Sequence, residues 1–242
     1  MEPPRTLRVL SYNIHGQAHR LDRRYLERVA RVVTDLAPDV VGMQEVHRGG
    51  WRARGADQAA ALGDLTGMAV AYGPSYRENG GERGGEFGNA VLTAGVIREA
   101  EVVPLPAPGE PRTLLRTRIA LSRQGDLELS FYVTHLAAWG RWGRPARSLQ
   151  TAALLARLRQ SSGPLVLVGD LNAEPHSPEL RPLLAGEVFR MCGDALVGTH
   201  RVMRQRIDYV FADPGWTTTS ERVVQAGPSD HWPVLVELER RS

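Results

Sequence analysis

Two polar residues follow an apolar segment in the stretch "PLVLVGDLN", which spans residues 164–172. Asp170 and Asn172 stand two positions apart there, so at the end of a strand their side chains can project from one face. A carboxylate beside an amide can orient and deprotonate a water molecule while the amide steadies an oxyanion. The pair therefore indicates hydrolytic chemistry.

Other polar residues end or precede further apolar segments. These residues are Asn13, Glu45, His135, Asp208, Asp230 and His231. Ligands usually bind at the strand ends of α/β sheets, so we expect these side chains to form one site. Asn13, Glu45 and Asp230 offer only oxygen donors, and no cysteine accompanies them. Such a donor set favours Mg²⁺ or Mn²⁺ over structural zinc.

The elements that must position these residues are predicted from hydrophobic periodicity. We expect strands over residues 7–14, 38–46, 68–72, 89–93, 97–103, 113–121, 127–136, 164–172, 206–211, 217–224 and 233–239. Helices are expected over 22–36, capped by Asp22, and over 57–65, 145–160 and 177–185. The glycine-rich stretch 73–88 is predicted to be a loop. Because no linker, charge block or repeat divides the chain, residues 1–242 are predicted to form a single mixed α/β domain.

Composition narrows the class of protein. The 242 residues are 42% hydrophobic and 24% charged, which is ordinary for a globular protein. Cys192 is the single cysteine and cannot form an intramolecular disulfide. No apolar run approaches the length of a membrane span, and no basic-then-apolar leader precedes the first strand. We therefore expect a cytoplasmic monomer with no transmembrane segment and no obligate protein partner.

All 30 basic residues are arginine, and the formal net charge is +3. Arginine suits bidentate contacts with phosphate, but a compositional bias explains its use at solvated positions more simply. The charge is compatible with an anionic substrate and does not establish one.

Seven short motifs follow one another along the chain: "SYNIHG", "PDVVGMQEV", "GNAVLT", "THL", "GDLNAEP", "RIDYVF" and "SDHWPV". In this order they resemble the endonuclease/exonuclease/phosphatase (DNase I-like) superfamily, and the match extends from Leu7 to Val236. The resemblance implies a four-layered α/β sandwich, with two mixed sheets packed face to face and helices outside. It also implies metal-assisted attack of water on a phosphate ester.

By position, the resemblance implies that Asn13, Glu45 and Asp230 surround the divalent cation. Asp170 would position or deprotonate the attacking water, and Asn172 would hold a phosphate oxygen. The residues of the metal site and of the hydrolytic step therefore come from segments that are far apart in the sequence.

The resemblance also assigns roles to the histidines. His231 would contact the phosphoryl group, with Asp208 fixing the orientation of its ring as carboxylates do for catalytic imidazoles. His135 stands where apurinic-site endonucleases carry tyrosine and where DNase I carries histidine, which argues against an abasic-site repair enzyme. A glutamate orients this histidine in DNase I, and Glu86 is the candidate for that role here.

The leading interpretation is a phosphodiesterase that acts on nucleic acid, either a DNA or an RNA nuclease. A phospholipid head group, or a sugar or inositol phosphate, is the alternative substrate class. A non-catalytic binding module is a third interpretation, against which the intact set of polar residues argues.

The segment "AAWGRWGRPARSLQ" begins two residues after His135 and alternates tryptophan with arginine. We predict that substrate is bound by Asn89 of "GNAVLT" and, within this segment, by Trp139, Trp142, Arg144 and Arg147. The tryptophans can stack on unpaired bases while the arginines meet phosphates, or they can enter a lipid interface while the arginines meet head groups. At least one of the two tryptophans is expected to be exposed.

Overall fold

The computed structural model describes residues 5–16, 23–78, 84–106, 108–122, 126–186, 188–193 and 196–240. Its strands are β1 (Arg5–Asn13), β2 (Val40–Arg48), β3 (Ala69–Arg77), β4 (Glu86–Thr93), β5 (Val96–Leu105), β6 (Arg112–Leu121), β7 (Leu127–His135), β8 (Leu165–Asp170), β9 (Arg190–Met191), β10 (Asp208–Ala212), β11 (Trp216–Val223) and β12 (Val234–Arg240). Its helices are α1 (Arg23–Leu36), α2 (Gln58–Thr66), α3 (Gly143–Leu158), the 3₁₀ turn η3 (Pro178–Leu180) and α4 (Arg181–Leu184). The helix cap predicted at Asp22 lies outside the described residues.

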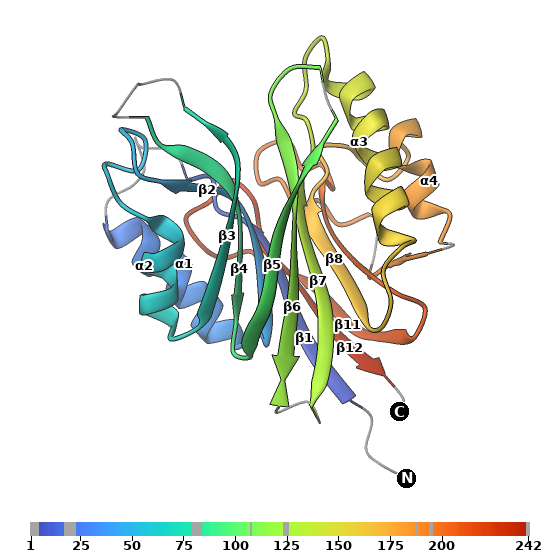
Figure 1. The fold of residues 1–242 in the computed structure, drawn as a ribbon, viewed down its shortest axis with the longest axis horizontal. Helices are drawn as coiled ribbons and strands as arrows, with labels where there is room; N and C mark the ends of the chain where they lie inside the picture. Colours follow the sequence, from blue (N-terminus) through green and yellow to red (C-terminus); the bar gives the residue numbers. More distant parts are fainter. Residues whose placement is uncertain are drawn as a thin grey trace.

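Two mixed sheets pack face to face, and helices cover their outer faces (Figure 1). Over the described residues, one sheet has six strands in the order β11-β12-β1-β2-β4-β3, and the other has six in the order β5-β6-β7-β8-β10-β9. The pairs β1–β2 and β7–β8 are parallel, and the other paired strands are antiparallel. This arrangement confirms the predicted four-layered α/β sandwich.

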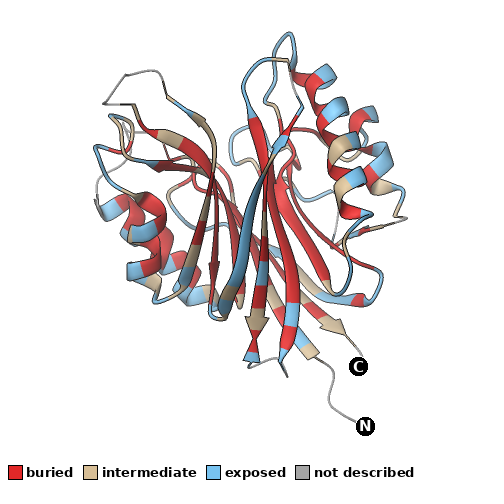
Figure 2. Cartoon of the chain, in the orientation of Figure 1, coloured by how far each residue is buried: buried red, intermediate tan, exposed pale blue. Residues whose placement is uncertain are grey.

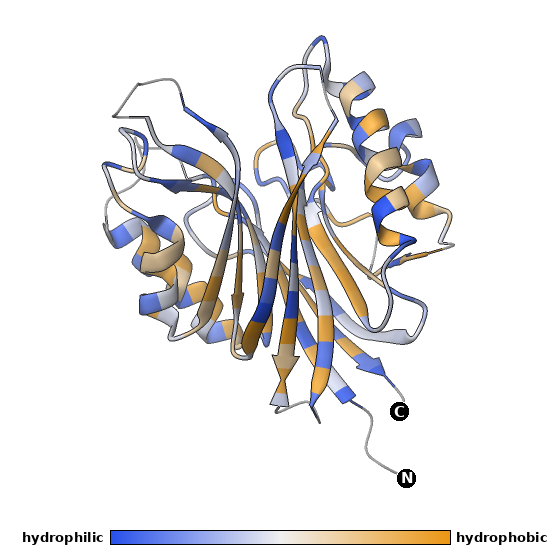
Figure 3. Cartoon of the chain, viewed as in Figure 1, coloured by the Kyte–Doolittle hydropathy of each residue, from blue (hydrophilic) through white to orange (hydrophobic). Residues whose placement is uncertain are grey.

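Buried apolar side chains hold the four layers together (Figures 2 and 3). The cluster between the two sheets includes Val9, Phe131 and Val168. Tyr25 and Val29, four positions apart on one face of α1, belong to a second cluster on the outer face of the first sheet. A third cluster packs α3 and α4 against the outer face of β7, β8 and β10. Among the described helices, none is long and apolar enough to cross a membrane.

The strand directions bring polar residues to one edge of the sandwich. At or near the carboxyl ends of the two parallel pairs lie Asn13, Glu45, His135 and Asp170. Because β10 is antiparallel to β8, its first residue, Asp208, lies opposite Asp170. Because β12 is antiparallel to β1, the turn that precedes β12 reaches the same edge and carries Asp230 and His231 there.

Strands β3 and β4 extend into the stretch 73–88, where the sequence predicts a loop, and this prediction was wrong at both ends of the stretch. The glycines and the proline there are compatible with a strand because β3 lies at the edge of its sheet, where Pro74 removes no essential ladder hydrogen bond. The register between β3 and β4 shifts between Pro74 and Tyr76, and this irregularity accommodates the proline ring. Tyr76 and Phe87, with ring centroids 5.1 Å apart, add apolar packing across the strand pair.

Candidate active site

Asn13 bridges the two sheets at the edge where the strands end. Its amide Nδ2 donates to Asp170 Oδ2 at 2.9 Å and to Glu45 Oε1 at 3.1 Å. Its Oδ1 accepts from the backbone N–H of His15 at 2.9 Å. The side chains of Asn13 and Asp170 are buried. This amide therefore fixes two carboxylates that come from different sheets.

Glu45 reaches this position through an irregularity in β2. The register with β4 shifts between Met43 and Val46, and Glu45 has a positive φ of 59°. Non-glycine residues in this strained region are concentrated at functional sites. The N–H of Gly16 donates to Glu45 O at 3.0 Å, and a Cβ on Gly16 would lie 2.3 Å from that oxygen. Glycine is therefore required beside the bulge that turns Glu45 toward Asn13.

His231 is buried against a buried carboxylate. Its Nδ1 lies 2.9 Å from Asp208 Oδ2, and its Nε2 lies 3.8 Å from Asp170 Oδ2. Burial alone would lower the pKa of His231, but the negative charges of Asp208, Asp170 and Glu45 raise this pKa to about 10. His231 is therefore an imidazolium near neutral pH, and Asp208 both orients and charges the ring.

The carboxylates around Asp170 are crowded enough to suit a cation. Burial, and then the charge of Asp208, raise the pKa of Asp170 above its usual value. Asp208 Oδ1 has no hydrogen-bond partner among the described residues. In the described part of the chain, two groups have ligand atoms within 4.8 Å of one another, namely Glu45–His135–Asp170 and Asp170–Asp208–His231. A divalent cation would offset the repulsion, and the carboxylate oxygens with the neutral ring of His135 fit Mg²⁺ or Mn²⁺.

Asp230 lines the same cavity as Glu45. Its Oδ2 lies 2.7 Å from His15 Nδ1. Burial alone would raise the pKa of Asp230, but the hydrogen bond from His15 and the charge of His15 lower this pKa to about 2. Ser229 Oγ donates to Asn13 O at 2.8 Å and ties this turn to β1. Of the three predicted metal ligands, Glu45 and Asp230 thus line the cavity, while Asn13 turns its amide nitrogen toward the carboxylates.

His135 is held by an arginine rather than by a glutamate. Its Nδ1 lies 2.9 Å from Arg112 Nη1, and Arg112 also pairs with Glu110 at 2.7 Å. Burial, and then the charges of Arg112 and His231, lower the pKa of His135 well below its usual value, so the ring is neutral. Glu86, the candidate for this role, instead forms ion pairs with arginines of β2 and β3. Sequence reasoning missed Arg112 because no motif marks it.

Asn172 stands between His135 and the carboxylate cluster. Its side-chain amide lies 2.9 Å from His135 Nε2, and its backbone N–H donates to Asp170 Oδ1 at 2.9 Å. Asn172 has a positive φ of 49°, so the chain turns sharply after β8. One cavity of about 280 Å³ is lined by four of the predicted catalytic residues, His135, Asp170, Asn172 and His231. The fifth, Asp208, contacts Nδ1 of His231.

The predicted tryptophans lie beside this cavity. Trp139 is 48% exposed and Trp142 is 51% exposed, which confirms that at least one of them is exposed. Trp139 Nε1 donates to the backbone oxygen of Asn172 at 2.9 Å, so the indole is anchored to the turn after β8. Arg144 is exposed, and its Nε lies 3.4 Å from Glu179.

Arg147 and Asn89, which were predicted to bind substrate, lie inside the fold. Arg147 is buried, donates to Glu179 at 2.8 Å and 2.9 Å, and also donates to Ala137 O at 3.1 Å. Asn89 is buried and donates to Thr113 O at 3.2 Å between the sheets. Both side chains are therefore used inside the fold, and neither lines the catalytic cavity.

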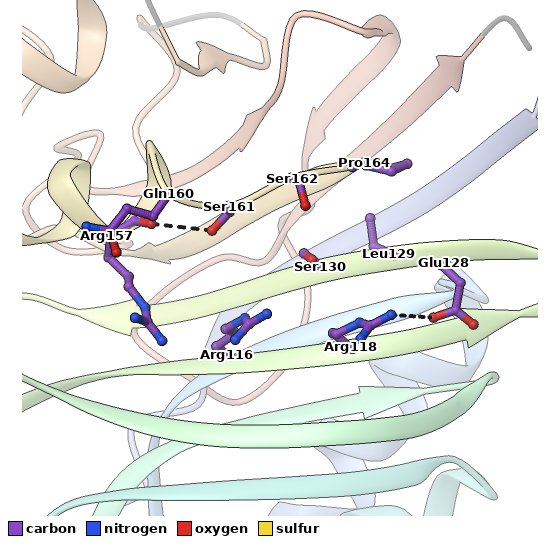
Figure 4. A pocket seen from close by; sticks show the side chains of 11 residues that line it. Arg116, Arg118, Glu128, Leu129, Ser130, Arg157, Gln160, Ser161, Ser162 and Pro164 are labelled. Atoms are coloured by element: carbon purple, nitrogen blue, oxygen red, sulfur yellow. Dashed lines mark hydrogen bonds and ion pairs between the residues drawn. The ribbon is translucent and has the colours of Figure 1, made fainter.

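A second polar cavity, of about 440 Å³, lies at the opposite end of β7 from His135 (Figure 4). Its three arginines are Arg116, Arg118 and Arg157. They pair with glutamates of the same surface, Glu99, Glu101 and Glu128. The charges cancel within the surface, and we assign no reaction to this cavity.

A family model described as the Endonuclease/Exonuclease/phosphatase family matches residues 10–231. No curated protein matches the chain. Among solved structures, an endonuclease/exonuclease/phosphatase from Beutenbergia cavernae is similar, with 26% identity and a TM-score of 0.81 over 98% of this chain and 72% of that one.

Two further similar structures carry more specific names. The human nocturnin catalytic domain with bound sulfate is 19% identical, with a TM-score of 0.80 over 99% of this chain and 94% of that one. A mannosyl-6-phosphatase from Bacteroides thetaiotaomicron is 20% identical, with a TM-score of 0.74 over 96% of this chain and 99% of that one. At these identities the likeness is one of fold.

Proposed function

Because the chain belongs to the endonuclease/exonuclease/phosphatase family, we propose that it hydrolyses phosphodiester bonds of nucleic acid with Mg²⁺ or Mn²⁺. One observation carries the proposal: carboxylates, an imidazolium and a neutral imidazole from both sheets converge on one cavity. This combination suits the attack of water on a phosphate ester.

Each side chain has a separate task in this reaction. Glu45 and Asp230 would hold the cation, which supplies neutralisation of the charge that develops on the phosphate. Asp170 accepts the proton of the attacking water, and its raised pKa strengthens it as a base. His231, kept protonated by Asp208, donates to a phosphoryl oxygen.

The mouth of the cavity favours nucleic acid as the substrate class. Trp139 and Trp142 are half exposed, and the neighbouring Arg141 and Arg144 are exposed. Aromatic rings that stack on bases, next to cations that meet phosphates, are typical of proteins that bind single strands.

A phospholipid head group is the second candidate, and one observation favours it. In the segment 196–206, Leu196 is 90% exposed and Val202 is 77% exposed, while Met203 lines the catalytic cavity. Exposed aliphatic side chains beside an active site can enter a membrane surface. A sugar phosphate is a further competitor, since a mannosyl-6-phosphatase has a similar fold.

A substrate screen tests the proposal. The protein is assayed with Mg²⁺ or Mn²⁺ on single- and double-stranded DNA, RNA, sphingomyelin, an inositol phosphate, mannose 6-phosphate and an aryl phosphodiester. We expect oligonucleotides to be cleaved, and excess chelator to abolish cleavage. Asp170→Asn provides the inactive reference, and Asp64→Asn, at an exposed position of α2, is the matched control. Full activity in chelator, or turnover confined to lipids or sugar phosphates, would contradict the proposal.

A further inference from the structure

A further cavity, distinct from the one lined by Arg116, Arg118 and Arg157, adjoins the catalytic cavity. It has a volume of about 270 Å³, and we call it the tryptophan cavity; its lining includes Gly109, Trp139, Arg141 and Trp142. It shares Glu110, Arg112 and Ala138 with the catalytic cavity, so the two spaces are contiguous.

The walls of the tryptophan cavity are held in place before any ligand binds. The indole of Trp139 is anchored to Asn172 O, on the turn that carries the catalytic amide. The backbone at Ala137 is fixed from behind, because its oxygen accepts from Arg147 and its N–H donates to Gln150 Oε1 at 2.9 Å. The buried Arg147 thus contributes to binding indirectly, by holding this loop.

A glycine turn and an arginine form the remaining wall. Gly109 has a φ of 105°, and a Cβ placed on it would lie 4.0 Å from Trp142 Cβ, so this loop passes close to Trp142 without filling the cavity. The guanidinium of Arg141 lies 5.2 Å from the centre of the Trp142 ring. The cavity is therefore bounded by two indoles, a glycine turn and a cation.

Arg112 stands at the boundary between the two cavities. It is 4% exposed, and its two terminal nitrogens contact His135 Nδ1 and Glu110. Its Nε is buried and has no hydrogen-bond partner among the described residues. Because both terminal nitrogens are engaged and Nε is inaccessible, Arg112 contributes its positive charge at this boundary, and that charge favours a phosphate group nearby.

We propose that the substrate straddles Arg112, with the reacting phosphate in the catalytic cavity and one unpaired nucleobase in the tryptophan cavity. This inference rests on the proposed function and adds a base-binding subsite to it. A paired base has its faces covered by its neighbours in the duplex, so the ring enters only from a single strand or from an opened end. Stacking is tolerant of sequence because every base has a π-face.

Two chromogenic diesters that differ in the base test the subsite. The substrates are thymidine 5′-(p-nitrophenyl phosphate) and methyl p-nitrophenyl phosphate, which lacks a base. We expect Trp142→Ala to raise KM for the thymidine ester by about 5- to 150-fold, as the loss of one stacked base implies. KM for the methyl ester, and kcat for both, should change by less than about twofold.

The matched control is Trp51→Ala, because Trp51 is 62% exposed and lines neither cavity. It should leave KM for both esters unchanged. Equal changes for both esters in Trp142→Ala, or no change in either, would overturn the subsite while leaving the proposed hydrolysis intact.

A binding measurement separates the subsite from the reaction. In wild type, adenosine 5′-monophosphate should quench tryptophan fluorescence, whereas ribose 5-phosphate should not, and Trp142→Phe should weaken the quenching. Quenching without hydrolysis of either ester would refute the proposed function and support the subsite. Equal effects of the two phosphates, or binding of anionic lipid vesicles that depends on Trp142, would refute the base-binding role.

Discussion

Replacing Asp208 by asparagine keeps the size of the side chain but removes the charge that holds His231 protonated. The two side chains are buried and joined by a 2.9 Å hydrogen bond. A hydrogen bond to a charged group contributes about 1.5–3 kcal/mol. If the transition state loses this amount, kcat falls by roughly 10- to 150-fold. The assay is steady-state hydrolysis of an aryl phosphodiester at saturating Mg²⁺.

The same substitution should change how stability depends on pH. In the metal-free protein, the pKa of His231 is raised from 6.5 to about 10. Between these values the native state retains a proton that the unfolded state has lost, so the free energy of unfolding is highest below the lower value and falls as the pH rises. In Asp208→Asn this decline should be shallower, as measured by urea unfolding at about pH 6.5 and about pH 9.5.

A double-mutant cycle decides whether Asp208 acts through His231. The loss of activity caused by Asp208→Asn should largely vanish in a His231→Ala background. Asp213→Asn is the matched control, because Asp213 is also a buried carboxylate but lies just after the far end of β10 and pairs with Arg240. This control should reduce stability and leave kcat unchanged. Additive losses in the double mutant would refute the reasoning and give Asp208 a separate role.

Three further outcomes are expected. Glu45→Gln should raise the Mg²⁺ or Mn²⁺ concentration needed for half-maximal rate, and an unchanged metal requirement would exclude Glu45 as a ligand. Arg147→Met should lower the free energy of unfolding by about 3–5 kcal/mol, because it leaves the buried Glu179 with only the longer contact to the exposed Arg144, and Glu179→Gln in that background should recover part of the loss. Cys192, whose pKa burial raises to about 11, should not react with an aromatic disulfide reagent at about pH 8 until the protein is unfolded. Rapid labelling of the folded protein would contradict this burial.

The sequence by itself determined the layers and most of the polar residues of the site. Local periodicity is sufficient to place a strand, and the polar residue that ends it follows directly, as for Asn13, His135 and Asp170. The helical spacing of α3 also indicates which of its faces is buried. Arg147 shares a face with Gln150, Thr151 and Leu154, which marks its side chain as buried.

Only the tertiary structure decided which side chains meet. His135 is oriented by Arg112 because β6 runs antiparallel to β7 and its first residue therefore reaches the end of β7, whereas Glu86 begins a strand of the other sheet. Asn13 joins Glu45 to Asp170 because the two sheets face each other. Strand register and the packing of sheets depend on contacts between residues far apart in the chain, and a period-two pattern is compatible with many registers. The type of chemistry can therefore be predicted from the sequence, whereas the neighbours that orient each side chain and shift its pKa depend on the tertiary structure.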